Sequence, residues 1–289
     1  MNEDIMAFKT GVHKLIEMAL MEDIGSGDLT TAGALRGNET GFAKAVAKSD
    51  TVVAGINVFR ESFMFLDPDI LFTAQVEDGD KVRRGDVIAV IQGRLGSILM
   101  AERTALNFFQ RMCGIANQTR RLVDAVKDTE VKIIHTRKTA PGLRILDTYA
   151  VRVAGGYSHR FGLFDGALIK ENHIAAAGSI AAAVANVRRR VPITVKIEVE
   201  VENLQQVEEA LAAGADVIMF DNMSVEDMKK AVTIVAGRVP LEASGNVTLA
   251  NVQDVAATGV NYISSGALTH SVQAADISLR VEYRDEIHS

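Results

Sequence analysis

Charged residues stand directly after short apolar runs in the second half of the chain. Arg137 and Lys138 follow one such run, Lys170 follows the next, and Glu200 and Asp221 close the two after that. Arginine can bind a carboxylate or a phosphate through two parallel hydrogen bonds, and lysine acts as a point charge. If these runs are neighbouring strands, the pattern predicts a cationic site for an anionic ligand.

Two small glycine-containing segments follow the last two apolar runs. Glycine lets backbone N–H groups approach a phosphate closely, and a helix that starts there adds a favourable dipole. Either segment alone is typical of an ordinary turn, but loops after the final strands of an α/β barrel frequently hold phosphate. We therefore predict phosphate binding by Ser244-Gly245-Asn246 and Ser265-Gly266-Ala267.

The two acids admit three interpretations. Glu200 and Asp221 end consecutive runs, so their carboxylates can bind a Mg²⁺ ion that a phosphate substrate brings, since this ion prefers oxygen ligands. They can equally accept hydrogen bonds from sugar hydroxyls, or form ion pairs with Lys170 and Lys138. The residues alone leave these alternatives open.

Three further residues can complete the cationic site. Arg103 lies on a long predicted helix, and His159 and Arg160 follow the flexible pair Gly155-Gly156. A lone histidine is more often structural, so the residues leave the role of His159 open. So many cations predict substrates that together carry several negative charges.

The apolar runs must be strands that bring these residues together. They alternate with amphipathic, alanine-rich segments, which predicts a parallel sheet with helical crossovers. An open doubly wound sheet is the competing fold, but polar residues at the end of strand after strand favour a closed or nearly closed barrel. The predicted strands are 131–136, 167–170, 193–201, 217–220, 241–244 and 262–265, and the predicted helices include 179–190, 204–213 and 224–235, with caps at Asn203, Ser224 and Thr248.

The run at 196–201 has two chemically different faces. Lys196, Glu198 and Glu200 alternate with three apolar residues, and a strand turns alternate side chains to opposite sides. We expect the apolar face to pack against helices and the charged face to point into the barrel. Charges placed there must pair, meet water or bind a ligand.

The chain before about residue 110 lacks this alternation. A helix at 12–22, a turn-rich loop at 25–28, several strand-like runs and a long helix from Leu99 toward Val126 predict an α+β layer. A tight-turn signal at 78–80 is similar to a lipoyl or biotinyl carrier hairpin, but Lys81 lies too close to the turn to be the modified lysine. The strand-like runs are 42–46, 51–54, 71–76 and 87–91.

Composition excludes several classes of protein. The 289-residue chain has a net charge of −6, no tryptophan and a single cysteine, Cys113. An acidic chain with few aromatic residues argues against a nucleic-acid-binding protein. Neither a signal pattern nor an apolar run of the roughly 20 residues needed to cross a bilayer is present. Together with the impossibility of an intrachain disulfide, this favours a cytoplasmic protein.

Several motifs in one order resemble the quinolinate phosphoribosyltransferase family, also called nicotinate-nucleotide pyrophosphorylase (decarboxylating), over essentially the whole chain. The sequence departs from the family pattern at His135, at 154–158 and at Cys113, none of which removes a named ligand. The motifs lie at 22–30, 102–107, 136–139, 141–144, 159–160 and 168–173.

The resemblance implies an enzyme, a pentosyltransferase of de novo NAD biosynthesis. Quinolinate and phosphoribosyl pyrophosphate would react, with Mg²⁺ required, to give nicotinate mononucleotide, pyrophosphate and CO₂. It also implies an N-terminal α/β sandwich domain over 1–112 and an α/β barrel domain over 113–289, of the type II phosphoribosyltransferase kind. The C-terminal tail would pack back on the N-terminal domain.

The resemblance further implies roles for the site residues. Lys138, Glu200 and Asp221 are the expected catalytic residues, and the two acids are the expected Mg²⁺ ligands. A homodimer is expected, in which Arg103 reaches the partner's site. The dicarboxylate would be surrounded by Arg103, Arg137, Arg160 and Lys170, the donor would be held by Lys138, Glu200, Asp221 and the two glycine segments, and Thr136 and His159 complete the substrate-binding set.

Two other enzymes compete with this interpretation. A Schiff-base aldolase would use Lys170 or Lys138 as its amine, but such a lysine must be desolvated, whereas several cations crowd together here. A transferase that acts on another pyridine acid is the nearer rival.

Overall fold

The computed structural model describes residues 2–282. Their contacts group them into two compact units: unit 1 comprises residues 2–118, 140–154 and 272–282, and unit 2 comprises residues 119–139 and 155–271. Helix α4 (Leu95–Ala125) runs through the predicted boundary between residues 112 and 113. The predicted domains, 1–112 and 113–289, stay a prediction, because a contact grouping does not by itself define a domain.

Unit 1 is built on an antiparallel sheet. One face of β1 (Thr40–Ala47) is buried, since Ala43, Ala45 and Ala47 are inaccessible and alternate with more exposed residues. This face shares one hydrophobic core with α3 (Ile56–Leu66) and α4. The sheet order is β12 (Ile277–Glu282), β1, β5 (Val87–Arg94) and β3 (Leu71–Ala74). The other elements of unit 1 are α1 (Asn2–Ile24), α2 (Leu29–Ala34), β2 (Thr51–Val52), β4 (Lys81–Val82) and α5 (Arg144–Val153).

The α+β prediction for this part of the chain is confirmed in its main elements. The predicted helix at 12–22 lies within α1, and the runs at 42–46, 71–76 and 87–91 overlap β1, β3 and β5. Several bounds differ: the runs at 51–54 and 71–76 are strands only at Thr51–Val52 and Leu71–Ala74, and α4 begins at Leu95, ahead of Leu99.

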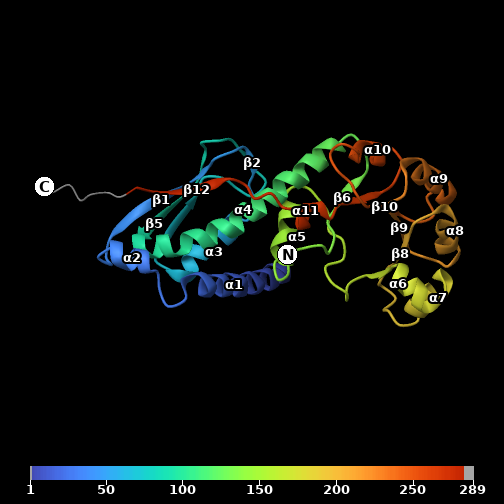
Figure 1. Cartoon of the computed structure of the whole chain (residues 1–289), viewed down its shortest axis with the longest axis horizontal. Coiled ribbons are helices and arrows are strands. Elements are labelled where there is room, and N and C mark those ends of the chain that lie inside the picture. The colour runs from blue at the N-terminus through green and yellow to red at the C-terminus, as the bar shows by residue number, and fades with distance from the viewer. Residues whose placement is uncertain (1, 283–289) are drawn as a thin grey trace. The chain divides into compact units, whose positions relative to one another are not determined.

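Unit 2 is a parallel α/β barrel (Figure 1). The second to the sixth strand of the unit lie side by side in chain order, and the first strand of the unit pairs with the last. The strand order has no reversal of the kind that marks a doubly wound sheet. Tyr157, which lies outside the named strands, forms an isolated parallel β-bridge with Ile134 of the first strand. The predicted barrel is therefore confirmed. The strand order is β7 (Ala167–Ile169), β8 (Ile197–Val201), β9 (Val217–Asp221), β10 (Leu241–Ser244), β11 (Tyr262–Ser264) and β6 (Lys132–Ile134).

Helices cover the outside of these strands. Figure 1 shows α7, α8 and α9 on the far side of β8 to β10 from the barrel interior. Asn203 and Ser224 cap their helices as predicted, because each side chain accepts from a backbone N–H of the first turn. Thr248 is not the N-cap of α10, which is Asn251, but its hydroxyl accepts from Ala250 N at 3.3 Å in the turn just before this helix. The helices of unit 2 are α6 (Glu171–Ala177), α7 (Ile180–Arg188), α8 (Leu204–Ala212), α9 (Val225–Val235), α10 (Val252–Ala256) and α11 (Ala267–His270).

Strand β8 shows the predicted division into two faces, with one exception. Its apolar side chains are fully buried, whereas Glu198 and Glu200 point to the barrel interior, where Glu200 lines a cavity. Lys196 is exposed and precedes the strand, so its predicted place inside the barrel is wrong. No helix in residues 2–282 is both long enough and apolar enough to cross a membrane.

Candidate active site

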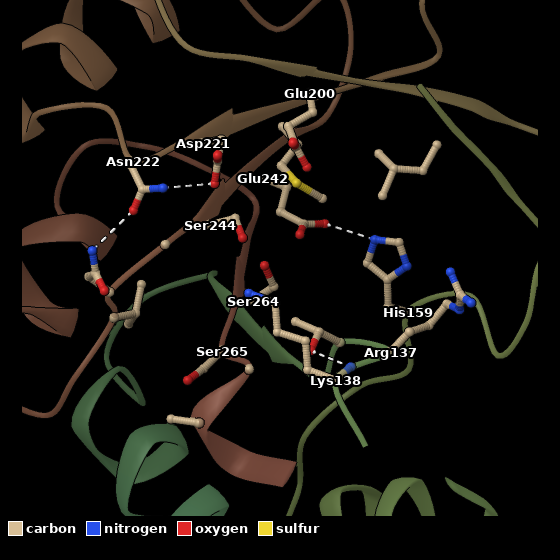
Figure 2. A pocket seen from close by; sticks show the side chains of 18 of the residues that line it. Arg137, Lys138, His159, Glu200, Asp221, Asn222, Glu242, Ser244, Ser264 and Ser265 are labelled. Atoms are coloured by element: carbon tan, nitrogen blue, oxygen red, sulfur yellow. Dashed lines mark hydrogen bonds and ion pairs between the residues drawn. The ribbon is translucent and has the colours of Figure 1, made fainter. Parts of the chain in front are cut away.

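A cavity of about 640 Å³ opens at the carboxyl ends of the strands of unit 2. The parallel strands all end on this side, so residues far apart in sequence converge there (Figure 2). Every predicted site residue except Arg103 lines the cavity. The lining comprises Thr136, Arg137, Lys138, His159, Arg160, Lys170, Glu200, Asp221, Ser244, Gly245, Asn246, Ser265, Gly266 and Ala267, joined by the unpredicted Leu168, Met219, Asn222, Glu242, Val247, Thr248, Ser264 and His270.

Two arginines face the cavity from neighbouring segments. The pKa of Arg160 is lowered, first by burial and then by the positive charge of Arg137. The Nε atoms of both guanidinium groups are buried and have no hydrogen-bond partner, although Arg160 Nη1 donates to Gly166 O at 2.9 Å. Like charges held together with unmet donors are costly in a folded protein, so this pair favours an anionic ligand.

The acids on β8 and β9 are in different situations. Glu200 forms an ion pair with Lys170 through its Oε2. Of the three interpretations of the acids, that of an ion-pair partner for Lys170 therefore applies to Glu200. Asp221 Oδ1 instead accepts from Asn222 Nδ2 at 3.2 Å. Figure 2 shows both carboxylates on the cavity side of their strands, where their oxygens can meet a ligand.

The backbone and side chain of Lys138 lie against residues of α11 and the turn before it. A Cβ atom added to Gly266 would lie 2.9 Å from Lys138 Cδ and 3.0 Å from His270 Cδ2. The Thr269 hydroxyl donates to Lys138 O at 2.8 Å, and Lys138 N donates to Thr136 Oγ1 at 3.1 Å. The backbone around Lys138 is therefore pinned, and the missing side chain of Gly266 leaves room for its stem.

His159 forms a cluster with Glu198 and Glu242, and His159 and Glu242 line the cavity. His159 Nε2 lies 3.0 Å from Glu198 Oε2 and 3.5 Å from Glu242 Oε2, and Figure 2 shows the ring facing Glu242. The backbone N–H of Arg160 donates to His159 Nδ1 at 2.7 Å. Nδ1 thus accepts, and the ring proton must sit on Nε2, from which it is donated to the carboxylates.

The protonation of this trio argues against a metal ion. Among the described residues, these three form the group whose ligand atoms, all within 4.8 Å of one another, could hold one. A protonated Nε2 has no lone pair to offer. Burial, and then the charge of Glu198, raise the pKa of Glu242 well above its usual value. We interpret the trio as a hydrogen-bonded cluster that orients His159, and not as a cation contact with the ligand.

Predicted site residue Arg103, and the departures from the family pattern at His135 and Cys113, do not line the cavity. Arg103 is exposed on α4 in unit 1. His135 is buried, with Nδ1 3.3 Å from Thr136 O, and Cys113 Sγ accepts from Ala54 N at 3.4 Å inside the core of unit 1. Burial raises the pKa of the Cys113 thiol to about 12, so this cysteine is inert packing.

Two unpredicted residues had a signal in the sequence. Glu242 lies two positions before Ser244 on the same strand, so period two places it on the same face as the predicted loop. Asn222 follows Asp221 directly and belongs to the same strand end. Ser264, Met219 and Leu168 gave no comparable signal, because such residues are common in ordinary cores.

Comparison with known families assigns both parts of the chain. Residues 28–113 match the model described as quinolinate phosphoribosyl transferase, N-terminal domain. Residues 115–280 match the model described as quinolinate phosphoribosyl transferase, C-terminal domain.

Individual relatives agree with the family models. The chain is 46% identical over 273 residues to the Bacillus subtilis (strain 168) protein named "Probable nicotinate-nucleotide pyrophosphorylase [carboxylating]", with 94% of each chain covered. It is 42% identical to a Nicotiana glauca protein named "Quinolinate phosphoribosyltransferase [decarboxylating] 2, mitochondrial", covering 93% of this chain and 82% of that one. The crystal structure of NadC from Streptococcus pyogenes superposes with a TM-score of 0.90 at 42% identity, covering 94% of this chain and 96% of the other.

Proposed function

The chain belongs to the quinolinate phosphoribosyltransferase family, and we infer that it transfers a phosphoribosyl group from phosphoribosyl pyrophosphate to quinolinate with loss of CO₂. The products are nicotinate mononucleotide, pyrophosphate and CO₂, a step of NAD biosynthesis. The observation that carries this inference is the pair Arg137 and Arg160, whose crowded charges and buried, unmet Nε donors suit a dicarboxylate.

We assign the quinolinate carboxylates to the arginine side of the cavity. Arg137 and Arg160 would bind them, and Lys170 would add charge from the end of β7. His159, held by Glu198 and Glu242, would shape this end of the cavity. Fixing both carboxylates would aim the ring nitrogen at the sugar of the donor, which lowers the entropic part of the barrier.

We assign the donor to the opposite side. The segments Ser244-Gly245-Asn246 and Ser265-Gly266-Ala267 would present backbone N–H groups to its phosphates, and Lys138 would add a point charge. As the bond to pyrophosphate lengthens, the sugar carbon gains positive charge. Glu200 and Asp221, on neighbouring strands, would stabilise that charge electrostatically. No covalent enzyme nucleophile is needed.

We propose Mg²⁺ as the cofactor, and the residues present fit it. Asp221 and the second oxygen of Glu200 are hard oxygen ligands at the cavity wall, of the kind that Mg²⁺ prefers. Two carboxylates are few enough to leave places for water and phosphate oxygens. When bound, the ion would offset the negative charge of the pyrophosphate group. Glu200 and Asp221 would hold it, while Lys170 keeps Glu200 oriented.

We further propose a cytoplasmic homodimer in which Arg103 of each copy reaches the cavity of the other. The exposed position of Arg103 on α4 supports this. Mixing the Arg103→Ala and Arg137→Ala proteins should restore activity to about a quarter of the wild-type value, because each mixed dimer contains one intact site. Mixtures no more active than the separate variants would contradict it.

The assay that tests the main proposal uses the purified protein with quinolinate, phosphoribosyl pyrophosphate and Mg²⁺. We expect equimolar nicotinate mononucleotide, pyrophosphate and CO₂, and loss of turnover when a chelator removes the metal. Nicotinate supplied in place of quinolinate should be a poor substrate. This result would distinguish the proposed enzyme from a transferase that acts on another pyridine acid. No product under any of these conditions refutes the proposal, and an adduct trapped by borohydride on Lys170 or Lys138 would support the aldolase instead.

A further inference from the structure

A chain of asparagine side chains links the end of β9 to the glycine segment after β10. Asn222 Nδ2 donates to Asp221 Oδ1 at 3.2 Å, and Asn246 Nδ2 donates to Asn222 Oδ1 at 3.2 Å. Figure 2 shows the first two side chains joined along the cavity wall, with the second bond continuing to the glycine segment. The backbone N–H of Asn222 also donates to Ser244 O at 3.0 Å. One residue therefore contacts both strand ends.

The backbone at this place is in an unusual conformation. Asn222 has φ 53° and Asn246 has φ 48°, in the left-handed region that side chains other than those of asparagine and aspartate rarely adopt. Among residues 2–282, Ala236 is the third non-glycine residue with positive φ. Strained backbone of this kind persists where the surroundings hold it, and it gathers at ligand sites.

Gly245 completes the arrangement. It has φ 99°, and a Cβ atom added there would collide with Asn222 Oδ1 and lie 3.0 Å from Asn222 N. The side chain of Asn222 thus fills the space that only glycine leaves open. The far end of the loop is held as well, because Asn251 Nδ2 donates to Asn246 O at 3.0 Å.

We propose that Asn222 is a positioning residue that holds Asp221 and the Ser244-Gly245-Asn246 segment in one arrangement and thereby sets the affinity for the phosphate-bearing ligand. The identity of that ligand rests on the proposed function. A carboxylate tied to an amide keeps one orientation, and a loop tied at both ends keeps its backbone N–H groups in one arrangement. Preorganisation of this kind lowers the entropy lost on binding. In the part of the chain that the structure describes, no hydrogen bond or ion pair joins Arg137 or Arg160, on the quinolinate side, to this network.

The test replaces Asn222 by glycine, which keeps the left-handed backbone and removes both side-chain hydrogen bonds. Titration calorimetry measures the Kd of Mg²⁺–pyrophosphate and, separately, of quinolinate. We expect the pyrophosphate Kd to rise about tenfold, since two modest hydrogen bonds are lost. The quinolinate Kd should stay within about twofold.

Two further variants make the result specific. Asn246→Gly removes only the hydrogen bond between Asn246 and Asn222, so the double variant should weaken pyrophosphate binding no more than Asn222→Gly alone. Ala236→Gly places a glycine at a left-handed position at the end of α9, outside the cavity. It should leave both Kd values unchanged, which shows that glycine in this conformation is not itself the cause.

The outcomes separate this inference from the proposed function. A pyrophosphate Kd unchanged by Asn222→Gly overturns the positioning role, as does an equal loss of affinity for both ligands, which would signify general loosening. Absence of pyrophosphate binding by the wild-type protein also overturns it. The proposed function depends on turnover of quinolinate, which is a separate measurement.

Discussion

The two units use buried charge in opposite ways. In unit 1, Arg111 meets Asp147 through two hydrogen bonds of 2.9 and 2.8 Å, and the Asp147 side chain is completely buried. In unit 2, Arg137 and Arg160 lie together, and their Nε donors are buried without partners. A charge satisfied within the chain stabilises the fold, whereas a charge left unsatisfied costs stability and is retained where a ligand satisfies it.

The largest effect is expected from breaking the pair in unit 1. Arg111→Leu leaves Asp147 buried without its cation, which should lower the free energy of unfolding by about 4 kcal/mol. Urea denaturation followed by circular dichroism measures this change. Replacing both residues by leucine should recover most of the loss, because the unpaired charge is then gone. A single variant as stable as the wild type would show that this pair is not structural.

Removing a positive charge from the cavity of unit 2 should do the reverse. Arg137→Ala and Lys138→Ala should each lower kcat/KM about 10²- to 10³-fold by removing charge that faces the substrates, while the melting temperature stays the same or rises. Arg188→Ala is the matched control, since Arg188 pairs with Asp216 outside the cavity. Unchanged turnover in Arg137→Ala or Lys138→Ala would remove that residue from the site.

Acid should act on unit 1 through Asp67. The Arg94 guanidinium beside the buried Asp67 carboxyl holds the pKa of that carboxyl well below its usual range. Because the folded-state pKa is depressed, the stabilisation is present above the unfolded pKa, about 3.9, and is lost as pH falls toward the folded value. Asp67→Asn should therefore cost about 2 kcal/mol at pH 6.

The same comparison should be repeated at lower pH. The difference between the wild type and Asp67→Asn should shrink steadily when urea denaturation is measured from pH 5 to pH 3. A gap that stays constant over this range would show that the charge of Asp67 contributes nothing.

The smallest effect is expected at the edge of the cavity. Gly266→Ala places a methyl group 2.9 Å from Lys138 Cδ, and the flexible lysine must move by a few tenths of an ångström. Gly266 has no left-handed backbone, so stability should hardly change, while kcat/KM should fall about fivefold through misplacement of the charge. Gly33→Ala, where a Cβ would meet nothing within 4 Å, is the control. Full activity in Gly266→Ala would mean that the position of Lys138 is not critical.

The sequence predicted the barrel well because period and alternation are local properties. Strands β6 to β11 each carry an apolar run followed by a polar end, and these signals do not depend on distant contacts. Two finer predictions are wrong: Thr248 is not the N-cap of α10, and Lys196 does not face the barrel interior. The first error arises because Asn251 binds Thr248 N in the folded chain, and the second because β8 begins only at Ile197, after Lys196.

Residue types and their order along the chain already predicted most of the charged side chains that meet at the carboxyl ends of the strands, because parallel strands must end on one side. Only the tertiary structure decided how those side chains are paired. Lys170 pairs with Glu200. His159 pairs with Glu198 and Glu242, and Asn222 donates a hydrogen bond to Asp221. These choices depend on distances of a few ångströms between different strands, and on backbone conformations such as the left-handed Asn222. The strength of a hydrogen bond or ion pair falls steeply over such distances, so no pattern along the chain can specify it.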